Sequence, residues 1–495
     1  MENKLYIYNT LSREKELFIP LHPPFVGLYA CGPTVYSDVH LGNLRTFTTF
    51  DLVYRYLTYL GYKVRYVRNI TDAGHTTNDA GDEQDRISQR AQIEQLEPME
   101  IVQKYTVGFH QVCEEFNLLP PSIEPTATGH IIEQIEMIER IIANGYAYVV
   151  NGSVYFNVKK YAEKYNYGKL SGRKLDELMA GTRELDGQDE KRFFADFAIW
   201  KAVPPEHIQR WRSPWGEGTP GWHLECSAMG TKYLGKQIDI HGGGMDLKFP
   251  HHECEIAQSV GSDGIEPVRY WMHANMLTVN GEKMSKSKGN SFLPMELIKG
   301  THHLLDKGYS AMVVRFFMMQ THYSSTLDFS NEALQGSEKG FNRLCEAINL
   351  LNQFSEQNFQ NSPDNEHDEE IKNRIESLST NMNDDFNTPK MIAVLFDLAS
   401  YVNKIKHENL VINRNTCINL KTSFNTFFTD VLGLKLESDN DNNVTSGLME
   451  LILEMRKDAR DNKNWTVSDK IRDTLAALKI QVKDEKDGAT WNKLR

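Results

Sequence analysis

Apolar positions near the start of the chain follow a strand–helix–strand pattern. Phe25 to Cys31 is an almost continuous apolar run that ends at Gly32-Pro33, which is typical of a buried strand. Five apolar residues then recur at steps of three and four and predict one face of a helix: Phe47, Phe50, Val53, Leu57 and Leu60. Gly61 stands where a helix-ending glycine belongs, and Lys63 to Ile70 returns to a strand pattern. This succession predicts a βαβ unit and hence an α/β fold with a parallel sheet and crossover helices.

The rest of the chain divides into regions of different pattern. Residues from about 121 to 267 mix helical and strand signals with loops rich in Gly and Pro, and the pattern after Phe292 is helical almost throughout. Two stretches predict exposed linkers: Phe354 to Glu370, with six acidic residues and no Lys or Arg, and Glu437 to Asn443. We therefore predict domains at residues 1–292, with an insertion at about 121–220, and at 293–353, 354–436 and 445–495.

The last region predicts two amphipathic helices. Their apolar faces are formed by Leu448, Leu451, Ile452 and Met455 on the first helix, and by Ile471, Leu475 and Leu478 on the second. From Gly447 onward there are 11 basic and 9 acidic residues, so this tail is locally positive although the whole chain carries a formal charge of −12. Such a balance excludes a mostly basic protein that coats nucleic acid, but it permits a large acidic enzyme with a local basic groove.

Composition and cysteine usage predict a reducing compartment. The 495 residues are 40% hydrophobic and 25% charged, which is ordinary for a globular protein of about three domains. We see no signal peptide at the start, and the most apolar stretch, Met312 to Met319, is too short to span a bilayer. Six scattered cysteines do not make a disulfide framework, so we expect a cytoplasmic protein.

The first candidate site is the segment TVYSDVHLGN, Thr34 to Asn43, between the first strand and its helix. A helix N-terminus offers unpaired backbone N–H groups and a positive dipole end, which suit a phosphate. Gly42 permits close approach of a nucleotide, and His40 and Asn43 are able to donate to phosphate oxygens. The alternative is a helix-capping turn with a surface histidine.

The second candidate site is EKMSKSKGN, Glu282 to Asn290. Its three lysines, two serines and glycine provide donors for a polyphosphate. A solvated basic loop is the alternative. Because both candidate segments occur in one chain that contains a βαβ unit, together they indicate nucleotide chemistry more specifically than either segment alone.

The third candidate site is a metal site. His251 and Glu255 are one helical turn apart, Cys226 precedes them, and Cys31 ends the first strand. Cys, His and Glu are zinc-ligand types, and thiolates make the site soft. Cys254 is a rival ligand, and buried cysteines also serve as small apolar side chains, which is the reading we prefer for the other three: Cys113, Cys345 and Cys417.

Taken together, these motifs resemble the class I aminoacyl-tRNA synthetases. HLGN at His40 to Asn43 stands where that class has HIGH, with Asn43 in place of the usual last histidine, and KMSKS at Lys283 to Ser287 matches in full. Further segments are similar to the cysteinyl-tRNA synthetase family: YACGP at 29–33, NITD at 69–72, YGKLSGR at 167–173, GWHLECSAM at 221–229, DIHGGGMDL at 239–247, FPHHECE at 249–255 and DDFNTP at 384–389. Residues 184–195 and 73–75 depart from the family pattern.

The resemblance implies ATP-dependent activation of L-cysteine and its transfer to the 3′ end of tRNA(Cys) by a monomeric enzyme without a membrane segment. The same resemblance implies a Rossmann-like domain with an insertion, followed by a stem-contact region, a helical bundle and a small anticodon-binding domain. It assigns one Zn²⁺ to Cys31, Cys226, His251 and Glu255, and Mg²⁺ accompanies ATP. The implied ATP-binding residues are Thr34, His40, Gly42, Asn43, Lys283 and Lys286, of which His40, Asn43 and the two lysines act in catalysis.

The family also places Gly32, Thr71, Trp222 and Asp246 around the amino acid. Core packing for Trp222 and a turn role for Asp246 are the alternatives, and in the tail Trp465 and Trp491 are either base-stacking or core residues. Zinc would explain how cysteine is told from serine, because packing discriminates near-isosteres poorly whereas a thiolate is a far better zinc ligand than an alcohol.

Two rival functions share some of these features. A ligase that joins cysteine to an amino sugar would have the nucleotide and zinc motifs, but about 200 residues after Phe292 argue against it. A non-catalytic tRNA- or zinc-binding relative would be expected to have lost phosphate-site residues, yet both KMSKS lysines are present.

Overall fold

The computed structural model describes residues 4–74, 86–175, 190–354, 359–360, 364–408, 410–436, 440–462, 464–478, 480–485 and 488–493, with the backbone alone for Lys286 and for parts of the last 60 residues. The chain forms two compact units, Met1–Lys435 and Leu436–Arg495. Among the described residues, no helix is long and apolar enough to cross a membrane.

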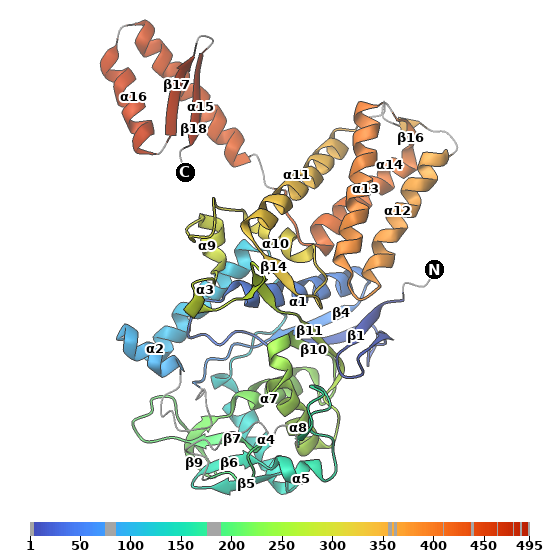
Figure 1. The fold of residues 1–495 in the computed structure, drawn as a ribbon, viewed down its shortest axis with the longest axis vertical. Helices are drawn as coiled ribbons and strands as arrows, with labels where there is room; N and C mark the ends of the chain where they lie inside the picture. Colours follow the sequence, from blue (N-terminus) through green and yellow to red (C-terminus); the bar gives the residue numbers. More distant parts are fainter. Residues whose placement is uncertain are drawn as a thin grey trace. The chain divides into compact units, whose positions relative to one another are not determined.

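A four-stranded parallel sheet lies at the centre of the first unit (Figure 1). Its strands are β3 (Phe25–Ala30), β4 (Lys63–Arg68), β10 (Ile238–Gly244) and β11 (Val268–Ala274), in the order β11-β10-β3-β4. Helix α1 (Leu41–Tyr59) connects β3 to β4 and α8 (His251–Asp263) connects β10 to β11, while α7 (Trp222–Leu234) precedes β10. The predicted βαβ unit is confirmed, and Gly61 has the positive φ of 89° that ends α1.

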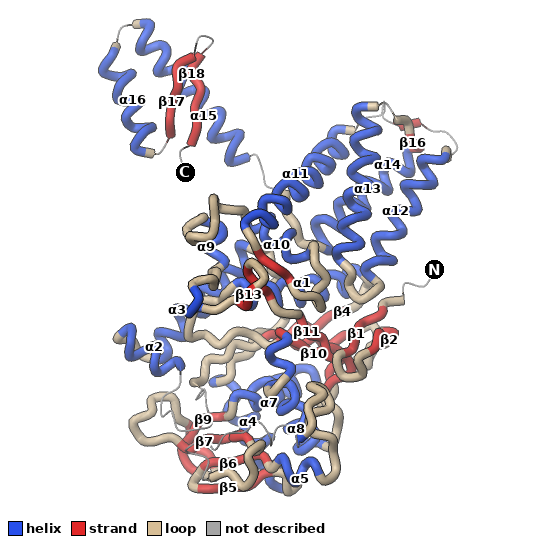
Figure 2. The backbone as a smooth tube through the Cα atoms, in the orientation of Figure 1, coloured by secondary structure: helices blue, strands red, loops and turns tan. Residues whose placement is uncertain are grey.

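The sheet has a topological switch point between β3 and β10. These neighbours pair in parallel, but the chain leaves β3 toward β4 on one side and leaves β10 toward β11 on the other. Helix α1 covers one face of the sheet, and α7 and α8 cover the other (Figures 1 and 2). In open α/β sheets a ligand binds outside the carboxyl ends of the strands at such a point, so the topology directs attention to Cys31 and the glycines after His241.

The insertion contains an antiparallel sheet that packs beneath α7 and α8. Its order is β5-β6-β7-β9-β8, formed by Ala147–Val150, Ser153–Phe156, Phe197–Ala202, Gly216–Pro220 and Trp211–Ser213. Helices α4 (Ile131–Ala143) and α5 (Val158–Ala162) accompany it. Helices α2 (Arg86–Glu94) and α3 (Pro98–Glu115) precede the insertion, and Phe109 of α3 packs against Phe47 of α1. One buried hydrophobic cluster runs from Tyr29 and Val67 through Leu224 and Val260 to Trp200, so the insertion and the parallel sheet share a core.

Strand β12 (Leu277–Val279) continues from β11 and pairs with β13 (Glu282–Lys283) and β14 (Leu327–Phe329). Arg45 on α1 fastens this region to the sheet. Its guanidinium is almost fully buried and donates to the carbonyls of four residues: Asn275, Met276, His322 and Ser325. Burial lowers the pKa of Arg45 to about 10. The helix that carries HLGN and the strand that precedes KMSKS are therefore joined by one buried side chain.

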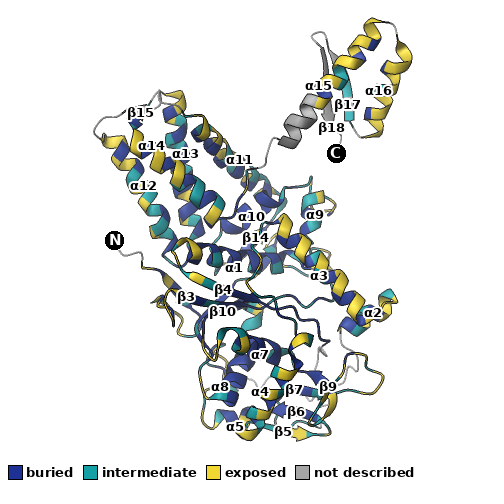
Figure 3. Ribbon diagram, turned by 180° about the vertical axis from the view of Figure 1, so that it is seen from behind, coloured by how far each residue is buried: buried dark blue, intermediate teal, exposed yellow. Residues whose placement is uncertain are grey.

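A helical region completes the first unit. It contains α9 (Pro294–Lys299), α10 (Ala311–Met319), α11 (Asn331–Gln353), α12 (Glu366–Met382), α13 (Thr388–His407) and α14 (Arg414–Asn425), followed by a π-helical turn (Thr426–Val431), with the short strands β15 (Phe359–Gln360) and β16 (Ile412–Asn413). The helices of the bundle turn buried residues inward and exposed residues outward (Figure 3).

The prediction that Phe354 to Glu370 forms a linker is wrong for its last residues, which belong to a helix. Helix α12 begins at Glu366, where Asn365 accepts the N–H of Asp368 as an N-cap. Three acidic residues lie in the first turn. Carboxylates at that position are stabilised by the helix dipole, so the charge run that resembles a linker starts a helix. Residues 355–358 and 361–363 lie outside the described part of the chain.

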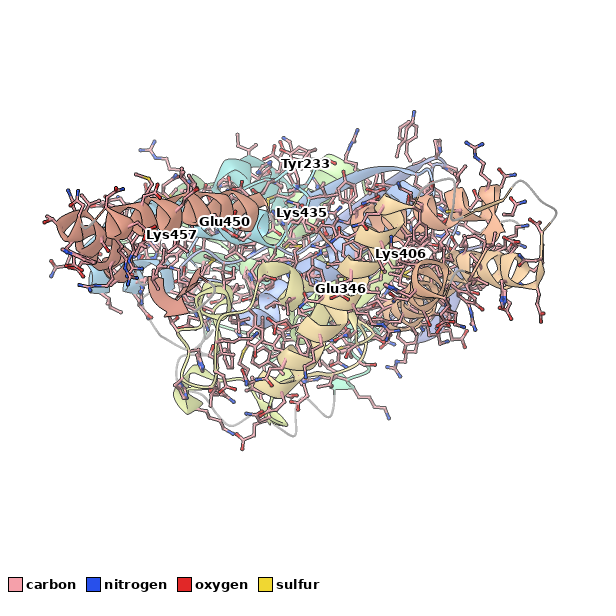
Figure 4. All side chains as sticks on the ribbon, turned by 90° about the horizontal axis from the view of Figure 1, so that it is seen from above. Tyr233, Glu346, Lys406, Lys435, Glu450 and Lys457 are labelled. Atoms are coloured by element: carbon pink, nitrogen blue, oxygen red, sulfur yellow. The ribbon has the colours of Figure 1, made fainter. Side chains whose placement is uncertain are left out.

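The second unit pairs two helices with a hairpin. Helices α15 (Asn440–Asp461) and α16 (Trp465–Ala477) were predicted, although α15 begins inside the expected linker 437–443. The hairpin of β17 (Ile480–Glu485) and β18 (Gly488–Lys493) was not predicted. Leu475 is buried, but Leu448, Leu451 and Met455 are each more than half exposed, so the predicted apolar face of α15 is not a core face within the unit. Exposed charged side chains such as Glu450 and Lys457 lie along α15 (Figure 4).

Candidate active site and metal centre

Four predicted ligands converge at the switch point. Cys31 follows β3, Cys226 lies on α7, and His251 and Glu255 lie one turn apart on α8. Their ligand atoms all lie within 4.8 Å of one another. Cys31 Sγ is 3.7 Å from Cys226 Sγ and 3.9 Å from Glu255 Oε1, and His251 Nε2 is 3.1 Å from the same Oε1. All four side chains are buried, so the cluster is closed to bulk water in this conformation.

The charges in this cluster are strongly coupled to one another. Burial raises the pKa of Cys31, whereas a hydrogen bond from Cys31 lowers the pKa of Cys226 to about 7. Burial disfavours the charge on Glu255, but His241 and His251 lower its pKa to about 2. Burial likewise opposes the charge on His251, yet the adjacent Cys226 and Glu255 side chains raise its pKa to about 10. At neutral pH one carboxylate, one imidazolium and the partly ionised Cys226 thiol therefore share a desolvated space.

The residues fit a zinc ion. His251 Nε2 is buried and makes no hydrogen bond of normal geometry, although Glu255 Oε1 is close. Two sulfurs, an imidazole nitrogen and a carboxylate oxygen are a recognised zinc donor set, and deprotonated donors that crowd each other are stabilised by a cation. A second set, Cys31, His241, His252 and Glu255, also meets the same distance limit. It contains only one sulfur.

Histidines around the cluster were missed by the sequence analysis. His241 Nε2 lies 3.0 Å from Glu255 Oε2, and its Nδ1 donates to the Tyr29 carbonyl at 3.0 Å. His252 Nε2 lies 3.3 Å from Cys31 Sγ, and its Nδ1 lies 2.8 Å from His273 Nε2. Second-layer partners of this kind orient metal ligands. The available signal was a histidine next to three glycines in the strand segment DIHGGG.

The remaining cysteines take no part in either ligand set. Cys254, the rival ligand, lies 3.5 Å from the Tyr167 hydroxyl. Cys113, Cys345 and Cys417 lie on α3, α11 and α14, and none belongs to a cluster of possible metal ligands among the described residues.

The four residues expected to surround the amino acid lie at the edge of the cluster. Gly32 N–H donates to Asn69 Oδ1, and a Cβ on Gly32 would lie only 1.5 Å from the Asn69 carbonyl oxygen, so only glycine fits. Thr71 Oγ1 donates to the buried Glu225 at 2.7 Å. The half-buried ring of Trp222 lies 4.5 Å from that of His251. Asp246 is exposed just beyond β10.

The nucleotide segment forms the start of α1. His40 is the N-cap: its Nδ1 accepts the Asn43 N–H at 3.2 Å, and its own N–H donates to Asn43 Oδ1 at 3.1 Å. Because Nδ1 accepts, the ring proton of neutral His40 lies on Nε2. Thr34 pairs with Thr71 as an isolated bridge, which connects this segment to the amino-acid edge. The segment therefore does form a helix cap, as the alternative interpretation expected. The cap uses the Asn43 side-chain oxygen and leaves the side-chain amide nitrogen available as a donor.

The KMSKS segment lies near the same helix start. A Cβ on Gly42 would lie 3.5 Å from Met284 Cε, so HLGN and KMSKS are neighbours. Lys283 ends β13 and is exposed, while Lys288 pairs with Glu282 at 2.8 Å. Lys286 begins a short helical turn, and its side chain lies outside the described part of the chain.

Comparison with solved structures identifies the fold. Mycobacterium tuberculosis methionyl-tRNA synthetase in complex with methionyl-adenylate superposes with a TM-score of 0.57 over 82% of this chain and 89% of that one, at 13% sequence identity. Residues 17–339 match the family described as the tRNA synthetases class I (C) catalytic domain. The fold and the site thus define a class I aminoacyl-tRNA synthetase.

Further family matches and related sequences identify the family within this class. Residues 378–437 match the DALR domain, and 448–491 match the cysteinyl-tRNA ligase anticodon binding domain. The cysteine–tRNA ligases of Phocaeicola vulgatus and Bacteroides fragilis are 56% and 55% identical to this chain, each over 99% of both sequences. The chain belongs to the cysteinyl-tRNA synthetase family.

Proposed function

We propose that this chain is a cysteine–tRNA ligase that selects L-cysteine through a Zn²⁺ held by Cys31, Cys226, His251 and Glu255. The observation that carries the proposal is the convergence of these four buried donors at the switch point of the sheet. ATP and L-cysteine give cysteinyl-adenylate and pyrophosphate, and the acyl group then passes to the terminal ribose of tRNA(Cys). We further propose that the enzyme is monomeric and cytoplasmic.

Zinc, when bound, supplies a soft Lewis acid that favours a thiolate over a hydroxyl group. The chain's contribution is to hold the donors in place. His241 binds the other carboxylate oxygen of Glu255 and is fixed in turn by the Tyr29 carbonyl. Gly32, Thr71, Trp222 and Asp246 bind the backbone groups of the amino acid at the edge of the cluster, where Glu225 orients Thr71.

The opposite side of the site binds the nucleotide. His40 donates from Nε2 and Asn43 from its amide nitrogen to phosphate oxygens at the start of α1, where Thr34 and Gly42 permit close approach. Lys283 and Lys286 neutralise the charge that develops on the α-phosphate and on the leaving pyrophosphate. Mg²⁺ accompanies the triphosphate. No covalent intermediate with the protein is needed, so catalysis consists of positioning and electrostatic stabilisation.

Pyrophosphate exchange, paired with tRNA charging, tests the function. A ligase of the proposed kind exchanges labelled pyrophosphate into ATP in the presence of cysteine and also charges tRNA(Cys). Exchange without charging would favour the amino-sugar ligase, and the absence of both would favour a non-catalytic relative.

Cobalt substitution tests the zinc assignment. Cobalt bound to thiolates has a charge-transfer band, which we expect cysteine to alter and serine to leave unchanged. If neither amino acid altered the band, the metal would be structural, and selection would depend on residues such as Trp222 and Asp246.

The predicted domain functions belong to the same proposal. Residues 1–292 bind ATP and cysteine, 293–353 form the stem-contact region, 354–436 form the bundle, and 445–495 read the anticodon. Trp465, which is 59% exposed at the start of α16, is available to stack on a base, whereas the side chain of Trp491 lies outside the described residues. A chain that ends before Gly447 should keep pyrophosphate exchange and lose most tRNA charging.

A further inference from the structure

Three cations from separate segments lie near one another on the surface. We name Arg13, Arg173 and Lys248 the basic cluster. Arg13 lies in the turn between β1 (Tyr6–Asn9) and β2 (Glu14–Leu17), Arg173 follows the LSG segment of the insertion, and Lys248 ends the short helix η2 (Met245–Lys248). Within the described part of the chain, none of the three forms an ion pair, whereas the neighbouring Lys15 pairs with Asp384.

Contacts between the segments hold these cations together. A Cβ on Gly172 would lie 2.2 Å from Arg13 Nη2, so the guanidinium lies directly against the backbone next to Arg173. The Arg173 guanidinium lies 4.3 Å from the centre of the Phe249 ring, and Phe249 follows Lys248. Burial and the charge of Arg13 lower the pKa of Lys248. The nearby carboxylate of Glu253, which accepts the Ser171 N–H at 2.9 Å, opposes this lowering.

The single negative charge of Glu253 offsets only part of the positive charge of the three cations. Acidic residues outnumber basic ones by 67 to 55 in this chain, so acidic partners are not scarce. Like charges brought together on a surface repel each other and raise the local concentration of anions. The cluster therefore has the electrostatic character of a binding site for phosphate groups.

A cavity adjoins the cluster and shares Lys248 with it. Its volume is about 450 Å³, and its lining includes Tyr8, Lys15, Lys248, His273, Tyr323 and Asp385. This size falls within the range of small-molecule sites. Asp385 and Phe386, in the turn that forms one wall, both have positive φ, at 62° and 53°. Strained residues of this kind are concentrated at functional sites.

The position of the cluster indicates its partner. Lys248 and Asp246, a residue proposed to bind the amino acid, lie in the same four-residue helix η2. A phosphate bound to the cluster is therefore close to the aminoacyl group. We propose that the basic cluster binds backbone phosphates of the single-stranded acceptor end of tRNA and so guides the terminal ribose to the adenylate. This inference depends on the proposed function, because it requires tRNA as the substrate.

Separate substitutions of the three residues test this proposal: Arg13→Ala, Arg173→Ala and Lys248→Ala. Each should raise the KM for tRNA(Cys) roughly 3- to 10-fold at low salt, because one phosphate contact is lost. Each should also reduce the slope of log(kcat/KM) for tRNA against log[salt] by about 0.7. Cysteine-dependent pyrophosphate exchange should stay within about twofold of the wild type, and Lys248→Arg should restore charging.

Lys104→Ala is the matched control, because it removes the same charge from an exposed lysine that is paired with Glu94 at 2.6 Å. The proposal is overturned if the cluster variants show the KM and the salt slope of this control. It is also overturned if exchange and charging fall together, because the cluster would then serve the fold or a free anion such as pyrophosphate. Failure of the proposed function is distinct, since the unmodified chain would then show no cysteine-dependent exchange.

Discussion

The two halves of the active site differ in how they hold charge. The four side chains proposed to bind the metal are no more than 6% exposed, and histidines surround them. Lys283 of the KMSKS segment is exposed, and the nearby Lys288 forms an exposed ion pair with Glu282. One half is desolvated before any substrate arrives, whereas the other remains in water.

This difference corresponds to the two chemical tasks. Telling sulfur from oxygen requires donors whose positions and protonation are set in advance, and a low-dielectric site strengthens each interaction. Stabilising a triphosphate requires charge, and lysines in water supply it without the cost of burying unpaired ammonium groups. We therefore expect substitutions in the two halves to affect different kinetic constants.

Cys226→Ser should have the largest effect. An alcohol is a poor zinc ligand, so metal binding is lost and kcat/KM for cysteine falls by about 10³-fold or more, while ATP binding is nearly unchanged. The metal content of the purified variant measures the loss of zinc, and pyrophosphate exchange measures the fall in kcat/KM for cysteine. Cys417→Ser, at a buried cysteine of α14, is the control and should retain the metal. A variant that kept its zinc and its preference for cysteine would contradict the ligand assignment.

Replacing either motif lysine, Lys283 or Lys286, with alanine should lower kcat for adenylate formation by about 10²- to 10³-fold. The KM for cysteine should change little, because the lost interaction is made with charge that develops in the transition state. Lys288→Ala, at the lysine paired with Glu282, should be close to wild type. Equal effects of all three substitutions on KM alone would indicate a solvated basic loop.

Zinc affinity should depend steeply on pH. In the metal-free cluster at pH 7, Cys31 is a thiol because burial raises its pKa, and His251 is protonated because its pKa is raised to about 10. Both must lose a proton to become ligands, and below pH 7 so must Cys226, whose pKa is about 7. Zinc binding therefore releases about two protons at pH 8 and about three at pH 6, and affinity falls about 100-fold per pH unit near pH 8 and about 1,000-fold per unit near pH 6. Calorimetry in buffers of different ionisation enthalpy counts these protons. Release of none would mean that the ligands are other residues.

His241→Asn should have the smallest effect of the four. The histidine does not belong to the two-thiolate set but binds its carboxylate, so its loss should weaken zinc binding about 10- to 100-fold and leave the KM for ATP unchanged. Competition with a chelator provides the measurement. His110→Asn, at an exposed histidine, is the control. If His241→Asn abolished zinc binding altogether, the set that contains His241 and His252 would be the ligand set.

The sequence was informative where one short segment determines the geometry. The βαβ unit follows from apolar spacing between Phe25 and Ile70, and the shared face of His251 and Glu255 follows from a helix. The position of Cys31 beside Cys226 came only from the family resemblance, because 195 residues separate them. No local pattern encodes contacts such as His241 to Glu255. The hairpin β17–β18 was missed because charged residues interrupt its alternation.

Arg45 also determines which part of the catalytic unit is able to move. Its guanidinium binds carbonyls at Asn275 and Met276 and so locks the strand that leads toward KMSKS to the helix of HLGN. A swing of KMSKS toward the nucleotide therefore has to pivot beyond this anchor. Asn280 and Gly281, which join β12 to β13, have φ values of 50° and 77°. The Gly281 N–H donates to Asp328 Oδ1 at 2.8 Å, so this turn is also tied to β14, and the strand side of KMSKS is fixed at two places.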